Sequence, residues 1–133
     1  MERYLIHREA DIGIAVWGVQ AKAQVMGFGS LRISQLATAV SELATNIIKY
    51  CPDSGGDILL YERSGSSGVE LIMQARDNGP GIADINAAMQ DHFSTSGSLG
   101  LGLPGVRRIA DDFEIVSVPD IGTIVTVSIR LMS

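Results

Sequence analysis

The stretch LRISQLATAVSELATNIIKY occupies residues 31–50 and predicts a long amphipathic helix. At about 100° per residue, one broad face of this helix is apolar. That face carries Ile33, Leu36, Ala37, Val40, Leu43, Ala44 and Ile47. A second helix is predicted before it, over residues 9–26, and Gly27 and Gly29 end that one. Ser30 is then the expected N-cap of the long helix.

The opposite side of the long helix carries Glu42, Asn46 and Lys49 within about 60° of one another. One interpretation is a solvated face with a Glu/Lys pair, which is the rule on amphipathic helices. The other is a phosphate and metal site. A carboxylate can accept a proton, an amide oxygen can bind Mg²⁺, and an ammonium can balance phosphate charge. The helix alone favours the first interpretation, and the glycine loops further along the chain favour the second.

The loop Asp77-Asn78-Gly79-Pro80-Gly81-Ile82 directly follows a predicted strand. Asn-Gly and Pro-Gly pairs are typical of turns, so one interpretation is a simple turn. A turn requires neither an aspartate at the strand end nor two glycines flanking a proline. Glycines let the backbone approach a flat ligand, and a fixed carboxylate can accept a hydrogen bond from an exocyclic amine. Taken alone, the loop fits the two interpretations equally.

A second glycine loop, Gly97-Ser98-Leu99-Gly100-Leu101-Gly102-Leu103, precedes a helix predicted from Pro104 to about Asp111. Free N–H groups at a glycine-rich helix N-terminus favour phosphate. The loop is not a P-loop, because no Gly-Lys-Ser/Thr follows, and no βαβ unit surrounds it as a Rossmann fingerprint requires. Residues 92–102 are rich in Gly and Ser, so we expect a segment that is mobile or that a ligand orders.

The rest of the pattern predicts strands joined as two hairpins, after a short edge strand. The expected strands are 4–8, 57–63, 69–76, 113–118 and 123–131. A short helix is also expected over residues 84–89. Helices come first, and two hairpins follow with a helix between them. The predicted fold class is therefore α+β, a two-layer α/β sandwich with a mixed sheet covered on one face by helices.

Composition narrows the classes of function. The 133 residues are 46% hydrophobic and 19% charged with a net charge of −5, which predicts one domain, residues 1–133, with a packed core. The absence of a basic stripe argues against a nucleic-acid partner. One cysteine, Cys51, excludes an internal disulfide and a multi-cysteine metal site. With no membrane-length apolar run and no signal-peptide pattern, we expect a cytoplasmic protein with no membrane association.

Taken together, these motifs resemble the GHKL (HATPase_c) ATPases, the superfamily of gyrase, Hsp90, MutL and histidine-kinase ATPase domains. Residues 42–46 resemble its N box, 77–82 its G1 box, 97–103 its G2 box, and Gly122-Thr123 its final Gly-Thr element. The four occur in the family's order, and the combination is specific although each part alone is not. The resemblance implies the family's Bergerat-type ATP-binding fold.

Within the superfamily, residues 41–46 and 93–108 resemble the RsbT-type serine/threonine switch kinases of the bacterial stressosome, relatives of the RsbW and SpoIIAB anti-sigma kinases. The resemblance implies ATP with Mg²⁺ as cofactors. It implies Glu42 as general base, Asn46 as Mg²⁺ ligand, Lys49 as phosphate contact and Asp77 as adenine reader. The implied adenine pocket is lined by Gly79, Gly81, Ile82 and Thr123. The implied phosphate-wrapping backbone is that of Gly97, Ser98, Leu99, Gly100, Leu101 and Gly102.

The same resemblance implies partners. Such kinases phosphorylate Ser or Thr on STAS-domain antagonist or scaffold proteins in partner-switching stress responses, and they bind and activate a metal-dependent protein phosphatase. Two other interpretations stay open, a nucleotide-gated binding module with little turnover and an anti-sigma factor. The chain has no phosphoacceptor-His helix pair, so a complete histidine kinase is not expected. Trp17 is expected to serve in packing, and Cys51 to be an inert structural thiol.

Overall fold

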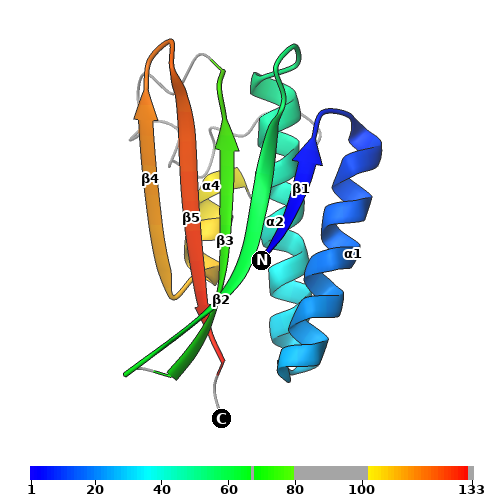
Figure 1. Cartoon of the computed structure of the whole chain (residues 1–133), viewed down its shortest axis with the longest axis vertical. Coiled ribbons are helices and arrows are strands. Elements are labelled where there is room, and N and C mark those ends of the chain that lie inside the picture. The colour runs from blue at the N-terminus through cyan, green and yellow to red at the C-terminus, as the bar shows by residue number, and fades with distance from the viewer. Residues whose placement is uncertain (67, 80–101, 132–133) are drawn as a thin grey trace.

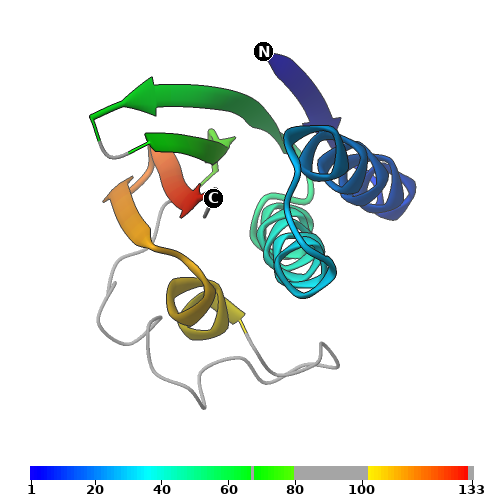
Figure 2. The same ribbon diagram turned by 90° about the horizontal axis from the view of Figure 1, so that it is seen from below.

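The computed structural model describes residues 1–66, 68–79 and 102–131. Within these residues, three helices form one layer and a five-stranded sheet forms the other, as Figures 1 and 2 show. The helices are α1 (Glu9–Met26), α2 (Ser30–Tyr50) and α4 (Gly102–Ile109). The strands are β1 (Glu2–Ile6), β2 (Gly56–Gly65), β3 (Gly68–Asp77), β4 (Asp112–Val118) and β5 (Gly122–Arg130). The predicted α+β sandwich with helices on one face is confirmed. The short helix expected over residues 84–89 lies outside the described residues, as does nearly all of the segment 92–102.

The sheet has the order β1-β2-β3-β5-β4, and each of these four neighbouring pairs is antiparallel. The prediction of a mixed sheet was therefore wrong. After β3 the chain returns through α4, so β4 runs in the same direction as β3 (Figure 1). β5 then inserts between these two strands and pairs antiparallel with both. Strands of equal direction exist, but they are not neighbours in the described sheet.

The ends of the first two helices show which local signals decide a boundary. α1 covers the predicted residues, and its chain reverses at Gly27, whose φ of 100° is left-handed. The Gly27 N–H donates to the carbonyls of Ala23 and Gln24, which closes the last turn. The prediction of Ser30 as N-cap was wrong, because Gly29 is the N-cap and Ser30 is already helical. Backbone conformation, not a hydroxyl cap, starts α2.

The core lies between α2 and the helix-facing side of the central strands. Alternate residues of a strand point to the same face, and on β3 and β5 these are Leu71, Met73, Val125 and Val127, each at most 5% exposed. Leu36, Val40, Leu43 and Ile47 on α2 are at most 3% exposed. A Cβ built on Gly56 would lie 3.1 Å from Ile47 Cγ2, so the helix and the sheet approach closely there.

Two charged clusters fasten the layers and the strands away from the core. The Asp57 carboxylate, 6% exposed, accepts hydrogen bonds from Arg3 on β1 and Arg76 on β3 at 2.6–2.9 Å. The hydrogen bond from Arg76 is the main cause of the lowered pKa of Asp57. Arg32 on α2 donates to both oxygens of Asp111, at 3.0 and 3.2 Å. This second pair ties the start of α2 to the segment between α4 and β4.

Trp17 does not pack as predicted. Its side chain on α1 is 73% exposed, although the neighbouring residue Gly18 is covered by the Tyr4 ring of β1. No helix among the described residues is long and apolar enough to cross a membrane.

Candidate functional site

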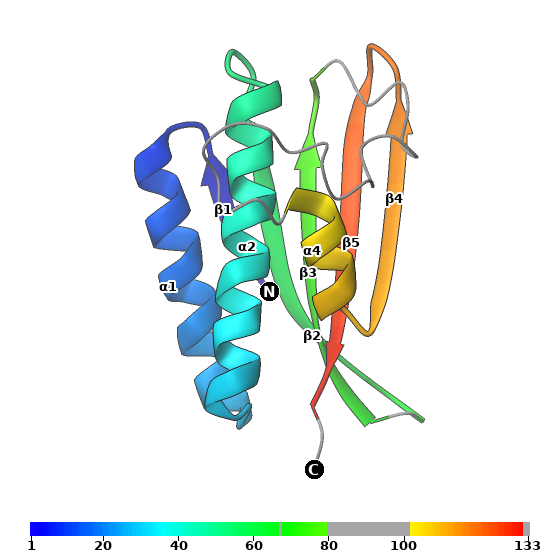
Figure 3. The same ribbon diagram turned by 180° about the vertical axis from the view of Figure 1, so that it is seen from behind.

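The C-terminal end of α2, the end of β3 and the start of β5 lie at the same end of the fold in Figure 3. α4 lies on the helix-covered side of the sheet and starts lower, near the middle of the strands. Of the predicted site residues, the structure describes Glu42, Asn46, Lys49, Asp77, Gly79, Gly102 and Thr123. Gly81, Ile82, Gly97, Ser98, Leu99, Gly100 and Leu101 lie outside the described residues. The described seven all belong to, or directly adjoin, these four elements.

Glu42 is buried, although the sequence placed it on the polar side of its helix. It is only 6% exposed, which rules out the interpretation of a solvated surface residue. No hydrogen bond or ion pair joins its carboxylate to any described residue. Its oxygens are not among the fully enclosed, unpaired polar atoms, which in the described chain are Glu2 Oε2 and Ser128 Oγ. A largely buried carboxylate that has no partner among the described residues is typical of a functional group.

Asn46 and Lys49 continue from Glu42 along α2. Residues three and four apart on a helix lie on one face, so the three side chains form one line. Asn46 is half-buried and Lys49 is exposed. The Lys49 ammonium lies 5.2 Å from the centre of the Tyr50 ring, a cation–π distance. The line therefore runs from a buried carboxylate, through an amide, to a solvated cation.

Asp77 is the last residue of β3 and points toward the helix layer. It lies in register with Gly56 on β2 and Thr123 on β5. Its Oδ1 accepts a hydrogen bond from the Gly79 N–H at 2.9 Å. That bond fixes the carboxylate at the start of the loop.

Cys51 lies beside this carboxylate, a contact that the sequence did not reveal. It is the C-cap of α2 and 4% exposed. A Cβ added to Gly79 would overlap its sulfur. Burial, the negative charge of Asp77 and a hydrogen bond to that side chain raise the pKa of the thiol to about 11. A protonated thiol of this kind is consistent with the predicted inert role, although it helps to hold Asp77. The sequence feature that could have indicated this contact is the position of Cys51 directly after the helix that carries Glu42.

Gly122 and Thr123 complete the same corner from β5. Gly122 has a φ of 152°, and a Cβ there would overlap the carbonyl oxygen of Asp77. Thr123 is 6% exposed, and its hydroxyl lies 2.8 Å from that of Ser117. The glycine allows β5 to start tightly against the end of β3, and the threonine places a hydroxyl next to Asp77. The predicted Asp77, Gly79 and Thr123 are thus brought together.

Gly102 opens α4 in a left-handed conformation, with a φ of 53°. It is buried, as are Leu103, Pro104, Gly105 and Val106. The first turn of α4 is therefore packed against the rest of the fold, and α2 is its helical neighbour. Pro104 lies in that first turn, as the sequence predicted.

The side chains near Glu42 and Asn46 disfavour a metal site made of protein ligands alone, but they allow an Mg²⁺ site completed by phosphates and water. No group of three or more His, Cys, Asp or Glu side chains within the described residues can hold a metal ion. Mg²⁺ needs no such cage, since it keeps several waters and binds through one or two protein oxygens together with substrate phosphates. The half-buried Asn46 amide next to Glu42 fits that mode.

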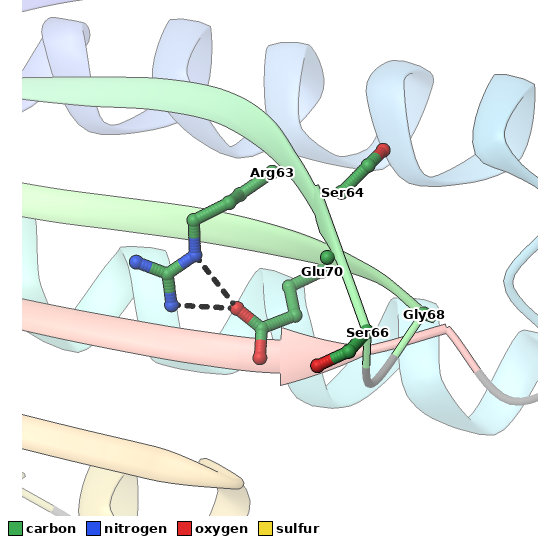
Figure 4. Close-up of a pocket in the computed structure, with 6 residues that line it drawn as sticks. Arg63, Ser64, Ser66, Gly68 and Glu70 are labelled. Atoms are coloured by element: carbon green, nitrogen blue, oxygen red, sulfur yellow. Dashed lines mark hydrogen bonds and ion pairs between the residues drawn. The ribbon is translucent and has the colours of Figure 1, made fainter.

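A hollow of about 210 Å³ at the tip of the β2–β3 hairpin lies at the other end of the sheet. In Figure 4 the Arg63 guanidinium reaches Glu70, and the two side chains bond at 2.7 and 3.1 Å. This pair lowers the pKa of Glu70. Because both charges are already matched, we assign no ligand to this hollow.

Comparison with known proteins identifies one family and several similar chains. The chain matches the family described as histidine kinase-, DNA gyrase B-, and HSP90-like ATPase over residues 32–133. It is 46% identical over 101 residues to serine/threonine-protein kinase RsbT of Bacillus subtilis (strain 168), covering 76% of this chain and 74% of that protein. It is 33% identical over 96 residues to an anti-sigma F factor of Thermoanaerobacter sp. (strain X514), covering 70% of this chain and 66% of that protein.

Among solved structures, the histidine kinase domain from the Erythrobacter litoralis EL346 blue-light activated histidine kinase is similar in fold. The TM-score is 0.53 at 20% sequence identity, over 92% of this chain and 60% of that one. At that identity the likeness shows a shared fold alone.

Proposed function

Since the chain belongs to the histidine kinase-, DNA gyrase B- and HSP90-like ATPase family, we propose that it is an ATP- and Mg²⁺-dependent protein serine/threonine kinase. Its substrates are STAS-domain antagonist or scaffold proteins of a bacterial partner-switching stress pathway. The observation that carries the proposal is Glu42, a carboxylate 6% exposed and without a partner among the described residues, one helical turn before Asn46. The 46% identity to a protein named as a serine/threonine kinase supports the same reaction class.

Glu42 acts as the general base in this proposal. The substrate hydroxyl gives its proton to the Glu42 carboxylate as its oxygen attacks the γ-phosphorus of ATP. The bond from that phosphorus to the β–γ bridging oxygen breaks, and ADP leaves. Phosphoryl transfer depends on positioning and charge neutralisation more than on covalent chemistry. A base held rigidly on a packed helix provides the positioning.

Asn46 and Lys49 handle the phosphate charge. The Asn46 amide oxygen is the protein ligand for Mg²⁺, which when bound neutralises charge on the phosphates. Lys49 is exposed, and its ammonium contacts phosphate from the solvent side. The main-chain N–H groups of residues 97–102 form the rest of the phosphate site.

Asp77 reads the base. Its carboxylate accepts a hydrogen bond from the adenine amine, while Gly79 and Thr123 line the pocket beside it, with Gly81 and Ile82. The Gly79 N–H and the Cys51 thiol also bond to this carboxylate and hold it in place. A fixed acceptor at this position selects adenine over guanine, which presents a carbonyl there.

The test is transfer to a candidate STAS protein with labelled ATP and Mg²⁺, and mass spectrometry to locate the phosphorylated Ser or Thr. Parent protein and Glu42→Gln are compared. Transfer by the parent and its loss in the variant support the kinase. No transfer to any candidate by the parent, with ATP still changing partner affinity in a pull-down, identifies a nucleotide-gated binding module instead.

The similarity to anti-sigma F factors makes one further arm worthwhile. A sigma factor is added to the same pull-down, with and without the STAS protein. Tight capture of the sigma factor that the STAS protein reverses indicates an anti-sigma factor. Capture of the STAS protein alone indicates a switch kinase. A metal-dependent protein phosphatase is the partner that the proposed switch kinase activates.

A further inference from the structure

A row of polar side chains crosses β3, β5 and β4 on the helix-facing side of the sheet. The row before it is apolar and belongs to the core or packs against it, and its members are Ala75, Val125 and Ile115. Two residues further on, the row consists of Asp77, Thr123 and Ser117. All three strands thus change from apolar to polar in the same row. Asp77 and Thr123 belong to the proposed base pocket, and Ser117 lies one strand further from it.

The β4–β5 hairpin closes directly after Ser117. Val118 and Gly122 are the last pair of its ladder, and the Ile121 N–H donates to the Val118 carbonyl at 3.0 Å. Asp120 has a φ of 67°, a left-handed conformation that aspartate adopts more readily than most residues. Ser117 therefore lies one residue before a closed turn, opposite Thr123.

The hydroxyl protons of Ser117 and Thr123 can be assigned by counting acceptors. The two oxygens lie 2.8 Å apart, a distance at which either hydroxyl could donate. Ser117 Oγ also donates to the Gly122 carbonyl at 3.4 Å, whereas within the described structure the Thr123 hydroxyl has the Ser117 oxygen as its one acceptor. Each hydroxyl has one proton, and buried hydroxyls are hydrogen-bonded. Both protons are therefore used only if Thr123 donates to Ser117 and Ser117 donates elsewhere.

We propose that Ser117 is a positioning residue that turns the Thr123 proton away from the base pocket, so that Thr123 presents an acceptor beside the Asp77 carboxylate. This inference rests on the proposed function, in which Asp77 reads the adenine amine. Two neighbouring acceptors favour a base edge that carries an amine and reject one that carries a carbonyl. A threonine hydroxyl without Ser117 can rotate and donate to that carbonyl. Ser117 thus contributes to base specificity through Thr123.

ATP and inosine triphosphate (ITP) are the sharpest pair of probes, because ITP has a carbonyl where ATP has the amine and lacks the second amine of guanine. Calorimetry with Mg²⁺ gives both affinities for the parent and for Ser117→Ala. The parent should prefer ATP. The preference should fall by about 10-fold in Ser117→Ala, mainly through tighter binding of ITP, because one hydrogen bond of this kind changes affinity by about that factor. Ser117→Thr keeps the hydroxyl and should restore most of the preference.

Two controls separate positioning from a structural effect. Ser128→Ala removes another buried hydroxyl of the sheet, 3% exposed and on the opposite face of β5, and should leave the preference unchanged. In a Thr123→Val background, Ser117→Ala should not change the preference further, because the hydroxyl through which Ser117 acts is missing. A loss of hairpin stability alone would weaken ATP and ITP equally and leave their ratio as it is.

The outcomes distinguish this inference from the proposed function. A parent that binds no ATP, or that binds ATP and ITP equally, would overturn the role of Asp77 as adenine reader and the inference with it. A parent that prefers ATP, with the same preference in Ser117→Ala, would overturn the inference alone. The inference would also be wrong if Ser117→Ala changed the preference as much in the Thr123→Val background as in the parent.

Discussion

Asp77 and Thr123 lie directly opposite each other in the register of β3 and β5, and both point toward the helix layer. The pair puts a carboxylate and a hydroxyl side by side at the end of the central strands. Thr123 is almost fully buried, and its hydroxyl is engaged with Ser117. Asp77 is therefore the more accessible acceptor of the two, and the base specificity of the site depends on it.

Asp77→Asn should weaken ATP binding by about 10- to 100-fold, because a charged acceptor is replaced by a neutral amide. The circular dichroism spectrum should not change. Calorimetric titration of parent and variant with ATP and GTP measures both affinity and selectivity. The parent should strongly prefer ATP, and equal binding of GTP by the parent would remove Asp77 from the role of adenine reader.

Glu42→Gln should retain ATP binding and lose phosphoryl transfer. Glutamine keeps the shape of the side chain but cannot take the proton, and loss of a general base typically costs about 10²–10⁴ in rate. Single-turnover kinetics with a STAS substrate measure the step directly, and ATP titration of the variant serves as control. Transfer at the parental rate would show that Glu42 is not the base.

Asn46→Ala should remove most of the gain in nucleotide affinity that Mg²⁺ provides. The amide is the protein's proposed oxygen ligand, and the remaining ligands would be phosphates and water. Calorimetry of ADP and ATP binding with Mg²⁺ and with EDTA gives the metal-dependent part for each protein. If that part is the same in the variant as in the parent, Mg²⁺ does not bind through Asn46.

Gly79→Ala should lower stability by about 1–3 kcal/mol, because the added methyl group overlaps the buried sulfur of Cys51. The matched control is Gly65→Ala, where a Cβ meets nothing within 4 Å. Adding Cys51→Ala to Gly79→Ala should restore part of the loss, since the two residues are in contact. Urea unfolding of the four proteins completes the cycle, and strictly additive effects would contradict the contact.

The raised pKa of Cys51 predicts a loss of stability at high pH. The folded thiol titrates at about 11 and the ordinary value is 9.0, so the unfolded state loses its proton first. The contribution is fully present below about pH 9 and disappears as the pH rises toward 11, with a slope of at most about 1.4 kcal/mol per pH unit. Urea unfolding from pH 8 to 11 should show a steeper decline for the parent than for Cys51→Ala. Parallel declines would mean that the thiol is not perturbed.

Local signals predicted the fold well. The glycines that end α1 and the alternating apolar residues of β5 are signals carried by residues close together in the sequence. Both α1 and β5 are where the sequence placed them. The four motifs together identified the family correctly. The strand order was less accessible, because the insertion of β5 between β3 and β4 is decided by packing across the sheet.

The sequence indicated which residues form the site better than it indicated their burial and contacts. The helical wheel aligned Glu42 with Asn46 and Lys49, yet it assigned them to a polar side, and the burial of Glu42 comes from elements distant in the sequence. The contact of Cys51 with Asp77 has the same origin, since it depends on how the end of α2 meets the end of β3. No pattern within either segment encodes it.

The line of Glu42, Asn46 and Lys49 on one helix makes this site sensitive to length as well as to identity. One residue inserted between Glu42 and Asn46 would rotate everything after it by about 100° and shift it by about 1.5 Å. The base would then lose its alignment with the metal ligand and with the end of β3 in a single event. Such an insertion should be far more damaging than most single substitutions. The β2–β3 hairpin tip at residues 63–68 lies at the far end of the sheet. A peptide tag or a fluorescent domain inserted there would leave the spacing of Glu42, Asn46 and Lys49 unchanged.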